Sequence, residues 1–109
     1  MRKYTLDLVQ LLHEQRDWSG KTFGPGARTQ GLIKHIKKEL VEIEEEPLSL
    51  EEWIDVMILA FDGAWRAGHD PEMIASMLLS KMAKNMRRDW PDWREVGEDN
   101  PIEHIRREK

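Results

Sequence analysis

Apolar side chains recur at helical spacing in four stretches of the chain, and no stretch alternates apolar and polar residues as a β-strand does. The stretches lie near residues 4–16, 29–46, 49–67 and 71–89. The second stretch has one apolar face, formed by Leu32, Ile33, Ile36, Leu40 and Ile43. The pattern therefore predicts an all-α protein with four helices.

Residues that start or stop helices give the bounds of these elements. Pro47 ends the second helix, because proline cannot continue a helix. Ser49, followed three residues later by Glu52, has the pattern of a capping box and starts the third helix. Asp70 before Pro71 starts the fourth. We expect the apolar stripe of the third helix in the core, and it consists of Ile54, Met57, Ile58, Phe61 and Trp65.

Two segments are predicted to be irregular. The first is the loop Trp18–Arg28, where glycine and proline interrupt regular structure. The second is a C-terminal arm over about residues 90–109, with a short helix after Pro101 that packs on a neighbour. The 109 residues fit a single domain, 1–109. Because so small a domain buries a limited share of its surface, we expect a homo-oligomer, a dimer or a tetramer, to complete the core.

The charge and composition narrow the choice of partners and compartment. A net charge of −4 argues against a broad nucleic-acid surface, although it permits a local basic pocket for an anionic ligand. No apolar run approaches the roughly 20 residues of a membrane span, so we expect no membrane association. The absence of cysteine fits a reducing compartment. We expect a cytoplasmic protein.

Four carboxylates on the second and third helices are the strongest sign of chemistry. Glu39 and Glu42 are one turn apart on one helix, and Glu52 and Asp55 are one turn apart on the next. In an antiparallel hairpin the first pair lies roughly 6 to 10 Å from the turn and the second roughly 5 to 9 Å, so the pairs are level. Facing carboxylates repel unless a cation neutralises them, and oxygen ligands suit Mg²⁺ or Mn²⁺. The alternatives are a solvated acidic face for the second helix and a capping role for Glu52, whereas Asp55 interrupts an apolar helix and has no comparable alternative.

The fourth helix adds positive charge where its apolar stripe should continue. The stripe passes into Lys81, Asn85 and Arg88, and Lys84 lies at its edge. Lysine and arginine bind phosphate oxygens, and asparagine can hydrogen-bond to sugar or phosphate. The alternative is that these side chains extend past the core and are only exposed.

Three further residues are candidates for substrate contacts. His35 precedes Glu39 by one turn and is suited to donate to a phosphate or to orient a carboxylate. Trp18 and Phe23 offer aromatic faces on which a base can stack. Their alternative role is to cover the end of the bundle.

The ExxE pair at Glu39 and Glu42, followed by ExxD at Glu52 and Asp55, resembles the metal motif of the all-α nucleoside triphosphate pyrophosphatases, which include MazG-like proteins and dimeric dUTPases. The gap between the pairs is shorter here than is usual in that motif. A closer resemblance extends from about Trp18 to Arg107. It rests on the segments FGPGAR, HIKKELVEIEEEP, EEWIDVMILAFDGAWRAGHDP, KMAKN, RRDWPDW and IEHIR. In this order they are similar to the phage and bacterial dATP/dGTP pyrophosphohydrolase family.

The resemblance implies a MazG-like four-helix bundle, at least a dimer, that hydrolyses purine deoxynucleoside triphosphates to the monophosphate and pyrophosphate. In this mechanism Glu39, Glu42, Glu52 and Asp55 hold one to three Mg²⁺ or Mn²⁺ ions and are the catalytic residues, with Glu42 taking the proton of the attacking water. Two alternatives stay open. One is the same chemistry on dUTP, dCTP or a damaged nucleotide. The other is a non-catalytic helical module that binds a protein partner through its tryptophan and methionine side chains.

Overall fold

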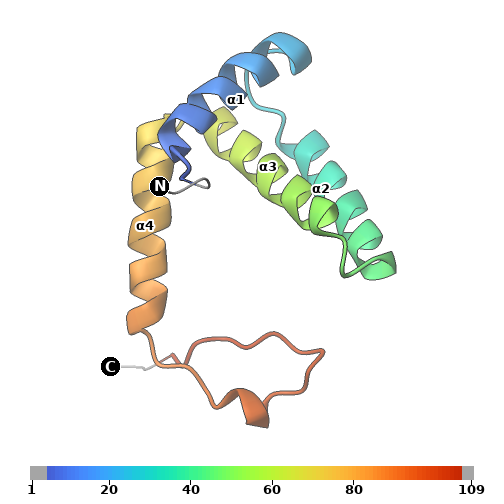
Figure 1. Cartoon of the computed structure of the whole chain (residues 1–109), viewed down its shortest axis with the longest axis vertical. Coiled ribbons are helices and arrows are strands. Elements are labelled where there is room, and N and C mark those ends of the chain that lie inside the picture. The colour runs from blue at the N-terminus through green and yellow to red at the C-terminus, as the bar shows by residue number, and fades with distance from the viewer. Residues whose placement is uncertain (1–4, 107–109) are drawn as a thin grey trace. The chain divides into compact units, whose positions relative to one another are not determined.

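The computed structural model describes residues 5–106, and in this range the chain forms helices and no strand (Figure 1). The elements are α1 (Leu8–Phe23), α2 (Thr29–Glu45), α3 (Leu50–Arg66), α4 (Pro71–Arg87) and the 3₁₀ turn η1 (Trp93–Glu95). The predicted all-α class with four helices is confirmed. The chain divides into two compact units, one ending at Ser76 and one beginning at Met77.

In the first unit α2 and α3 form an antiparallel hairpin, and α1 packs against α3 (Figure 1). The turn between α2 and α3 occupies residues 46–49 and is held by the backbone N–H of Ser49, which donates to the Glu46 carbonyl at 3.0 Å. The Trp53 indole also donates to the Pro47 carbonyl at 2.9 Å. At the tip of the turn the side chain of Leu48 is 98% exposed. The two helices are thus joined by a short, well-bonded turn.

Helix α1 is longer than the sequence pattern predicts. The carboxylate of Asp7 accepts from the Gln10 backbone N–H at 3.1 Å and caps its start, while the predicted start at Tyr4 lies outside the described residues. The helix continues through Trp18 to Phe23 and stops at Gly24, whose φ of 91° favours glycine. The predicted loop over 18–28 is therefore wrong for its first six residues. The apolar spacing fades after Leu12, but contacts with α3 keep the backbone helical.

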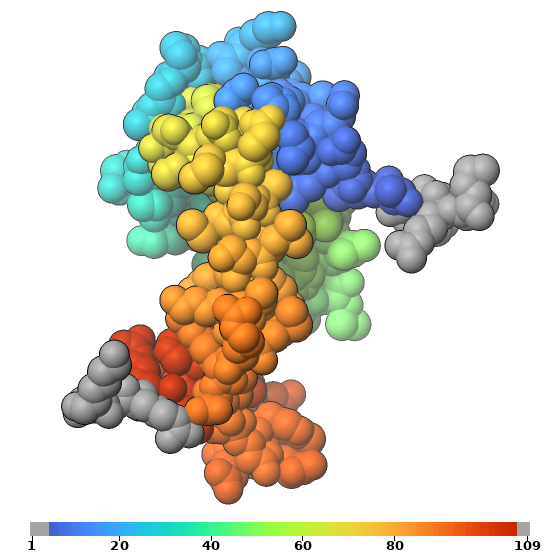
Figure 2. Space-filling model, turned by 90° about the vertical axis from the view of Figure 1, so that its left-hand side faces the viewer, coloured from blue at the N-terminus to red at the C-terminus, as the bar shows by residue number. Residues whose placement is uncertain are grey.

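The start of α4 agrees with the prediction. The Asp70 carboxylate accepts from the Met73 backbone N–H at 2.8 Å, and Pro71 occupies the first helical position. His13 Nε2 of α1 lies 2.6 Å from Glu72 Oε1 in the first turn of α4. Figure 2 shows this contact region, where the yellow atoms at the start of α4 meet the blue atoms of α1.

The buried apolar core of the described residues is small: Leu12, Ile43 and Ile74. The predicted core stripe of α3 is wrong for the single chain, because Ile54, Met57 and Ile58 are exposed. Phe61 and Trp65, on the same helix, are half-buried.

The second unit contains the rest of α4, the turn η1 and an irregular segment. The Asp92 carboxylate accepts from the Arg94 backbone N–H at 3.0 Å and caps η1. The predicted short helix after Pro101 is wrong over residues 101–106, where the chain forms no regular secondary structure and the Ile105 N–H donates to the Asp89 carbonyl at 2.8 Å. No helix within residues 5–106 is long and apolar enough to cross a membrane.

Candidate active site

The hairpin of α2 and α3 brings together carboxylates from both helices. One oxygen each of Glu39, Glu52 and Asp55 lies within 4.8 Å of the other two. Glu39 is 7% exposed, and Glu52 and Asp55 are half-buried. This convergence follows from the short turn, since residues at similar distances from the turn are level on antiparallel helices.

Glu42 is the fourth member of this acidic cluster, which we define as Glu39, Glu42, Glu52 and Asp55. A hydrogen bond with Glu42 is the main cause that raises the pKa of Glu52 to about 7, and burial and a hydrogen bond with Glu39 act in the same direction. Hydrogen bonds with Glu39 and Glu52 lower the pKa of Glu42 itself. The cluster therefore retains a shared proton near neutral pH, held mainly by Glu52.

Two oxygen atoms of the cluster are buried without a hydrogen-bond partner, Glu39 Oε2 and Glu52 Oε2. A buried carboxylate oxygen without a partner is costly, and a cation is the partner that removes this cost. The donors are all carboxylate oxygens, which suit a hard divalent cation such as Mg²⁺ or Mn²⁺. The residues present thus fit a divalent metal ion, with Glu39, Glu52 and Asp55 as the converging ligands.

The capping role considered for Glu52 is not what the structure shows. Ser49 occupies the N-cap position of α3, but its side chain makes no capping hydrogen bond. The Glu52 side chain interacts with Glu42 and Glu39 across the hairpin instead. The sequence has the pattern of a capping box, but the hydrogen bond from the backbone to the Ser49 side chain does not form.

His35 lies beside the acidic cluster. Its Nε2 atom is 3.3 Å from Glu39 Oε1, one turn along α2, and its side chain is half exposed. The imidazole is placed to orient the Glu39 carboxylate, which is one of the two roles that its position in the sequence indicated.

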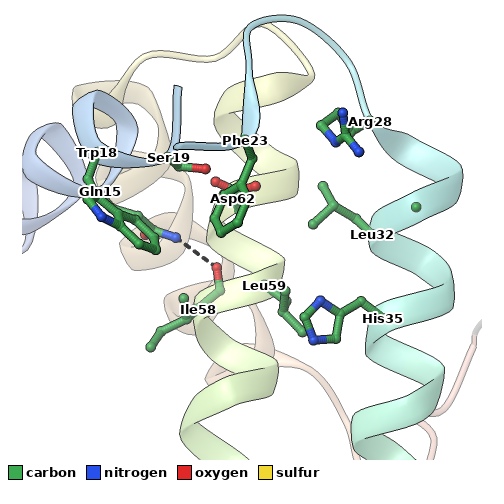
Figure 3. A pocket seen from close by; sticks show the side chains of 11 residues that line it. Gln15, Trp18, Ser19, Phe23, Arg28, Leu32, His35, Ile58, Leu59 and Asp62 are labelled. Atoms are coloured by element: carbon green, nitrogen blue, oxygen red, sulfur yellow. Dashed lines mark hydrogen bonds between the residues drawn. The ribbon is translucent and has the colours of Figure 1, made fainter. Parts of the chain in front are cut away.

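A pocket of about 220 Å³ lies in the first unit between α1, α2 and α3 (Figure 3). Trp18 and Phe23 of α1 line it, and their rings meet edge to face at a centroid distance of 5.3 Å. His35 lines the same pocket from α2. Since His35 also contacts Glu39, one side chain links the pocket to the acidic cluster. The lining residues from α3 include Ile58, Leu59 and Asp62.

A buried ion pair lies below this pocket, between Asp62 and Arg66 of α3. Arg66 Nε donates to Asp62 Oδ2 at 2.8 Å, and the Trp65 indole donates to Asp62 Oδ1 at 2.8 Å. Burial alone raises the pKa of Asp62, but hydrogen bonds from Ser19, Arg66 and Trp65 outweigh it and lower the pKa. Asp62 is therefore ionised at neutral pH and balances the charge of Arg66.

The candidate phosphate ligands Lys81, Lys84, Asn85 and Arg88 belong to the second unit. Arg88 Nη1 donates to Asn85 Oδ1 at 3.1 Å, so these two side chains lie side by side. Burial lowers the pKa of His104, and the positive charges of Arg88, Arg106 and Lys81 lower it further. Lys81 and Arg88 of the candidate set thus act electrostatically on His104.

The family of the chain follows from a comparison with family models. Residues 11–108 match the model of the dATP/dGTP pyrophosphohydrolases. The chain belongs to this family. It is therefore an enzyme, a nucleoside triphosphate diphosphatase, and the alternative of a non-catalytic interaction module is set aside. Searches of curated proteins and of solved structures found no match.

In this pyrophosphohydrolase the structure groups most of the candidate residues on the first unit. The acidic cluster and His35 lie side by side, and Trp18 and Phe23 share a pocket with His35. The roles of all these residues and of the four on α4 stay predictions. Asp62 and Arg66 were missed, although an acid and a base four residues apart on an apolar helix are a recognisable signal.

Proposed function

We propose that this enzyme hydrolyses dGTP and dATP to the monophosphate and pyrophosphate at the acidic cluster, with Mg²⁺ or Mn²⁺ as cofactor. The observation that carries the proposal is the convergence of Glu39, Glu52 and Asp55 within 4.8 Å. The two buried carboxylate oxygens without a partner support it. The family supports the reaction and the purine substrates.

When bound, a divalent cation supplies charge neutralisation for the phosphate oxygens and lowers the pKa of water. Glu39, Glu52 and Asp55 are its ligands in this proposal. Glu42 is the one carboxylate of the cluster that is not a metal ligand in this proposal. Its lowered pKa keeps it ionised and able to accept a proton. His35 Nε2 lies 3.3 Å from Glu39 Oε1, and in this proposal the imidazole orients that carboxylate.

The reaction needs no side-chain nucleophile. Water attacks the α-phosphorus, its proton passes to an oxygen of Glu42, and the bond from the α-phosphorus to the bridging oxygen breaks as pyrophosphate leaves. Lys81 and Arg88 neutralise the charge that builds on the leaving group, and Asn85 and Lys84 contribute further contacts to the phosphates or sugar.

The pocket beside His35 is the proposed site of the base. Trp18 and Phe23 present aromatic surface to it, and stacking on such surface stabilises any base, more so a purine because its face is larger. A base in this pocket directs the triphosphate past His35 toward the acidic cluster. The arrangement supports a preference for purines without fixing which purine is preferred.

We also propose that the chain works as a homo-oligomer. Ile54, Met57 and Ile58 form a continuous apolar stripe on α3 and are exposed in the single chain. Exposed apolar surface of this kind favours association with another copy. Light scattering coupled to size-exclusion chromatography measures the mass in solution, and a mass of one chain at assay concentrations contradicts this part of the proposal.

The test of the function is an assay of all canonical nucleoside triphosphates and of dUTP with Mg²⁺ or Mn²⁺. Products are resolved into monophosphate plus pyrophosphate or diphosphate plus phosphate. We expect the first pair, with kcat/KM higher for dGTP and dATP than for dCTP and dTTP. Equal turnover of all four contradicts the purine preference, and diphosphate plus phosphate contradicts the attack at the α-phosphorus.

The variant Asp55→Asn tests the place of the reaction. It should abolish turnover and keep the helical circular dichroism spectrum, because the loss of one negative charge relieves repulsion in the cluster. Glu51→Gln is the matched control, since Glu51 is exposed on the same helix outside the cluster. Near-normal turnover by Asp55→Asn excludes the acidic cluster as the site.

A further inference from the structure

The guanidinium group of Arg66 is the most completely bonded buried group of the first unit. Its side chain is 2% exposed and stands on the last turn of α3. An arginine has five N–H donors, and the structure gives each of them an acceptor. Nε donates to the carboxylate of Asp62 at 2.8 Å, on the same helix.

The other four donors of Arg66 reach a different part of the chain. Nη1 donates to the carbonyls of Gly24 and Gly26, each at 2.9 Å. Nη2 donates to the carbonyl of Ser19 at 3.3 Å and to its hydroxyl at 3.0 Å. Ser19 is 1% exposed, so these bonds are shielded from water. We refer to Ser19, Asp62 and Arg66 as the Arg66 network.

These bonds need the backbone that the two glycines allow. Gly24 has a φ of 91° and Gly26 a φ of 84°, conformations that side chains with a Cβ rarely adopt. In these conformations both carbonyls point to one nitrogen of Arg66. The FGPGAR segment therefore does more than reverse the chain direction. It presents two backbone carbonyls to the buried guanidinium group of Arg66.

The Arg66 network adjoins the pocket, because two of its three residues belong to the pocket lining. Trp18 precedes Ser19, and Phe23 precedes Gly24, so the two aromatic residues are adjacent to acceptors of Arg66. Asp62 and Ser19 themselves line the pocket (Figure 3). One buried side chain of α3 thus bonds to the backbone immediately after each of the two rings.

The geometry points to Arg66 as a positioning residue that sets the selectivity of the pocket for the base. Through Ser19, Gly24 and Gly26 it holds Trp18 and Phe23 in their edge-to-face arrangement beside the pocket, where their exposed ring surface is available to a base. This inference rests on the proposed function, because it takes the pocket as the base site. Arg66 touches neither the phosphates nor the acidic cluster in this account, so its loss affects recognition of the base and leaves the metal ligands in place.

Arg66→Lys and Ser19→Ala test the inference. Lysine keeps the positive charge beside Asp62 but loses the planar group of five donors. Alanine at position 19 removes the hydroxyl that accepts from Arg66 and donates to Asp62, and it leaves the Ser19 backbone carbonyl in place. Three quantities are measured: kcat and KM for dGTP and dCTP, the affinity for Mn²⁺, and hydrogen exchange over residues 18–28. Arg94→Lys is the control, because Arg94 is an exposed arginine paired with Asp92.

We expect the ratio of kcat/KM for dGTP to that for dCTP to fall roughly tenfold in Arg66→Lys, mainly through the KM for dGTP, since small displacements of binding groups are costly. The change in Ser19→Ala should have the same direction and be smaller. Exchange over residues 18–28 should accelerate in both variants, while the Mn²⁺ affinity stays within about twofold of the unmodified enzyme. Arg94→Lys should change none of these quantities.

The inference is overturned if the ratio of kcat/KM for dGTP to that for dCTP is unchanged in the folded variants. It is also overturned if the affinity for Mn²⁺ falls in parallel with this ratio, because that result indicates general damage to the fold. If Arg66→Lys does not fold, the ratio of kcat/KM for dGTP to that for dCTP in Ser19→Ala tests the inference. If the unmodified chain hydrolyses no triphosphate, the proposed function is wrong independently of the inference. The ratio of the affinities for dGMP and dCMP is then measured in place of the ratio of kcat/KM values. Absence of dGMP binding to the unmodified chain overturns the inference as well.

Discussion

The acidic cluster should bind a divalent cation in competition with a proton. Without a cation, the hydrogen bond with Glu42 raises the pKa of Glu52 to about 7. The cation and this proton use the same carboxylate oxygens, so binding of one requires release of the other. This competition is tested by titrating the metal-free enzyme with Mn²⁺ at pH 8 and again at pH 6.

The expected size of the effect follows from this pKa. With a pKa of about 7, the ionised fraction of Glu52 is about 0.9 at pH 8 and about 0.09 at pH 6. The apparent affinity for Mn²⁺ should therefore be roughly tenfold weaker at pH 6 than at pH 8. Close to one proton should be released per bound cation at pH 6, and close to none at pH 8.

The same pKa gives the sign of the effect on stability. The folded chain holds a proton on Glu52 up to about pH 7, whereas the unfolded chain releases it near the ordinary glutamate pKa of 4.5. Because the folded state binds more protons between these values, the contribution of this group stabilises the metal-free fold below about pH 4.5 and is lost as the pH rises through 7. Mn²⁺ should raise the melting temperature most at pH 8, where the cluster carries its full negative charge.

Calorimetric titration measures both quantities if it is repeated in two buffers with different enthalpies of ionisation. Glu52→Gln should remove the proton release, because glutamine does not titrate, and should raise the metal-free melting temperature at pH 8. Glu51→Gln, outside the cluster, should behave as the unmodified enzyme does. An apparent affinity that is the same at pH 6 and pH 8, with no proton release at pH 6, refutes the reasoning.

Two further predictions concern the substrate. Lys81→Ala or Arg88→Ala should weaken triphosphate binding roughly tenfold and leave Mn²⁺ affinity unchanged, since each removes a charged hydrogen bond to phosphate. Equal nucleotide affinities, measured in a competition assay with the control Arg94→Lys, place these residues outside the site. Trp18→Ala should narrow the purine preference about fivefold, which corresponds to ~1 kcal/mol of stacking. If the kcat/KM ratio of dGTP to dCTP stays as it is, Trp18 does not contact the base.

The acidic cluster was predictable because it depends on two local rules. The helical repeat places Glu39 and Glu42 on one side of α2, and the turn of residues 46–49, which contains Pro47, folds α3 back beside it. Neither rule needs knowledge of distant contacts. The start of α4 was predictable for the same reason, since Asp70 and Pro71 act on their own helix. Ser49 occupies the N-cap position of α3 as predicted, although its side chain makes no capping hydrogen bond.

The features that were missed depend on contacts between elements far apart in the sequence. The last turns of α1 lack a strong apolar repeat, and Ser19 is held there by Arg66, 47 residues away. Asp62 and Arg66 form a local pair, but the acceptors at Gly24 and Gly26 become visible only when the chain is folded. The exposed stripe of α3 was predicted to lie in the core of the chain. Apolar spacing identifies the side chains that are stabilised by burial, but it does not identify the surface that covers them.

The tip of the turn between α2 and α3 gives direct spectroscopic access to the acidic cluster. Leu48 is almost entirely exposed, and the chain contains no cysteine. Leu48→Cys therefore creates a unique thiol on a side chain that packs against nothing, and exposed substitutions of this kind usually change stability by less than about 0.5 kcal/mol. A nitroxide or fluorophore attached there is carried by the turn that joins the two helices bearing the carboxylates. Paramagnetic Mn²⁺ in the cluster would broaden or quench such a label, so that occupancy can be followed without a substrate.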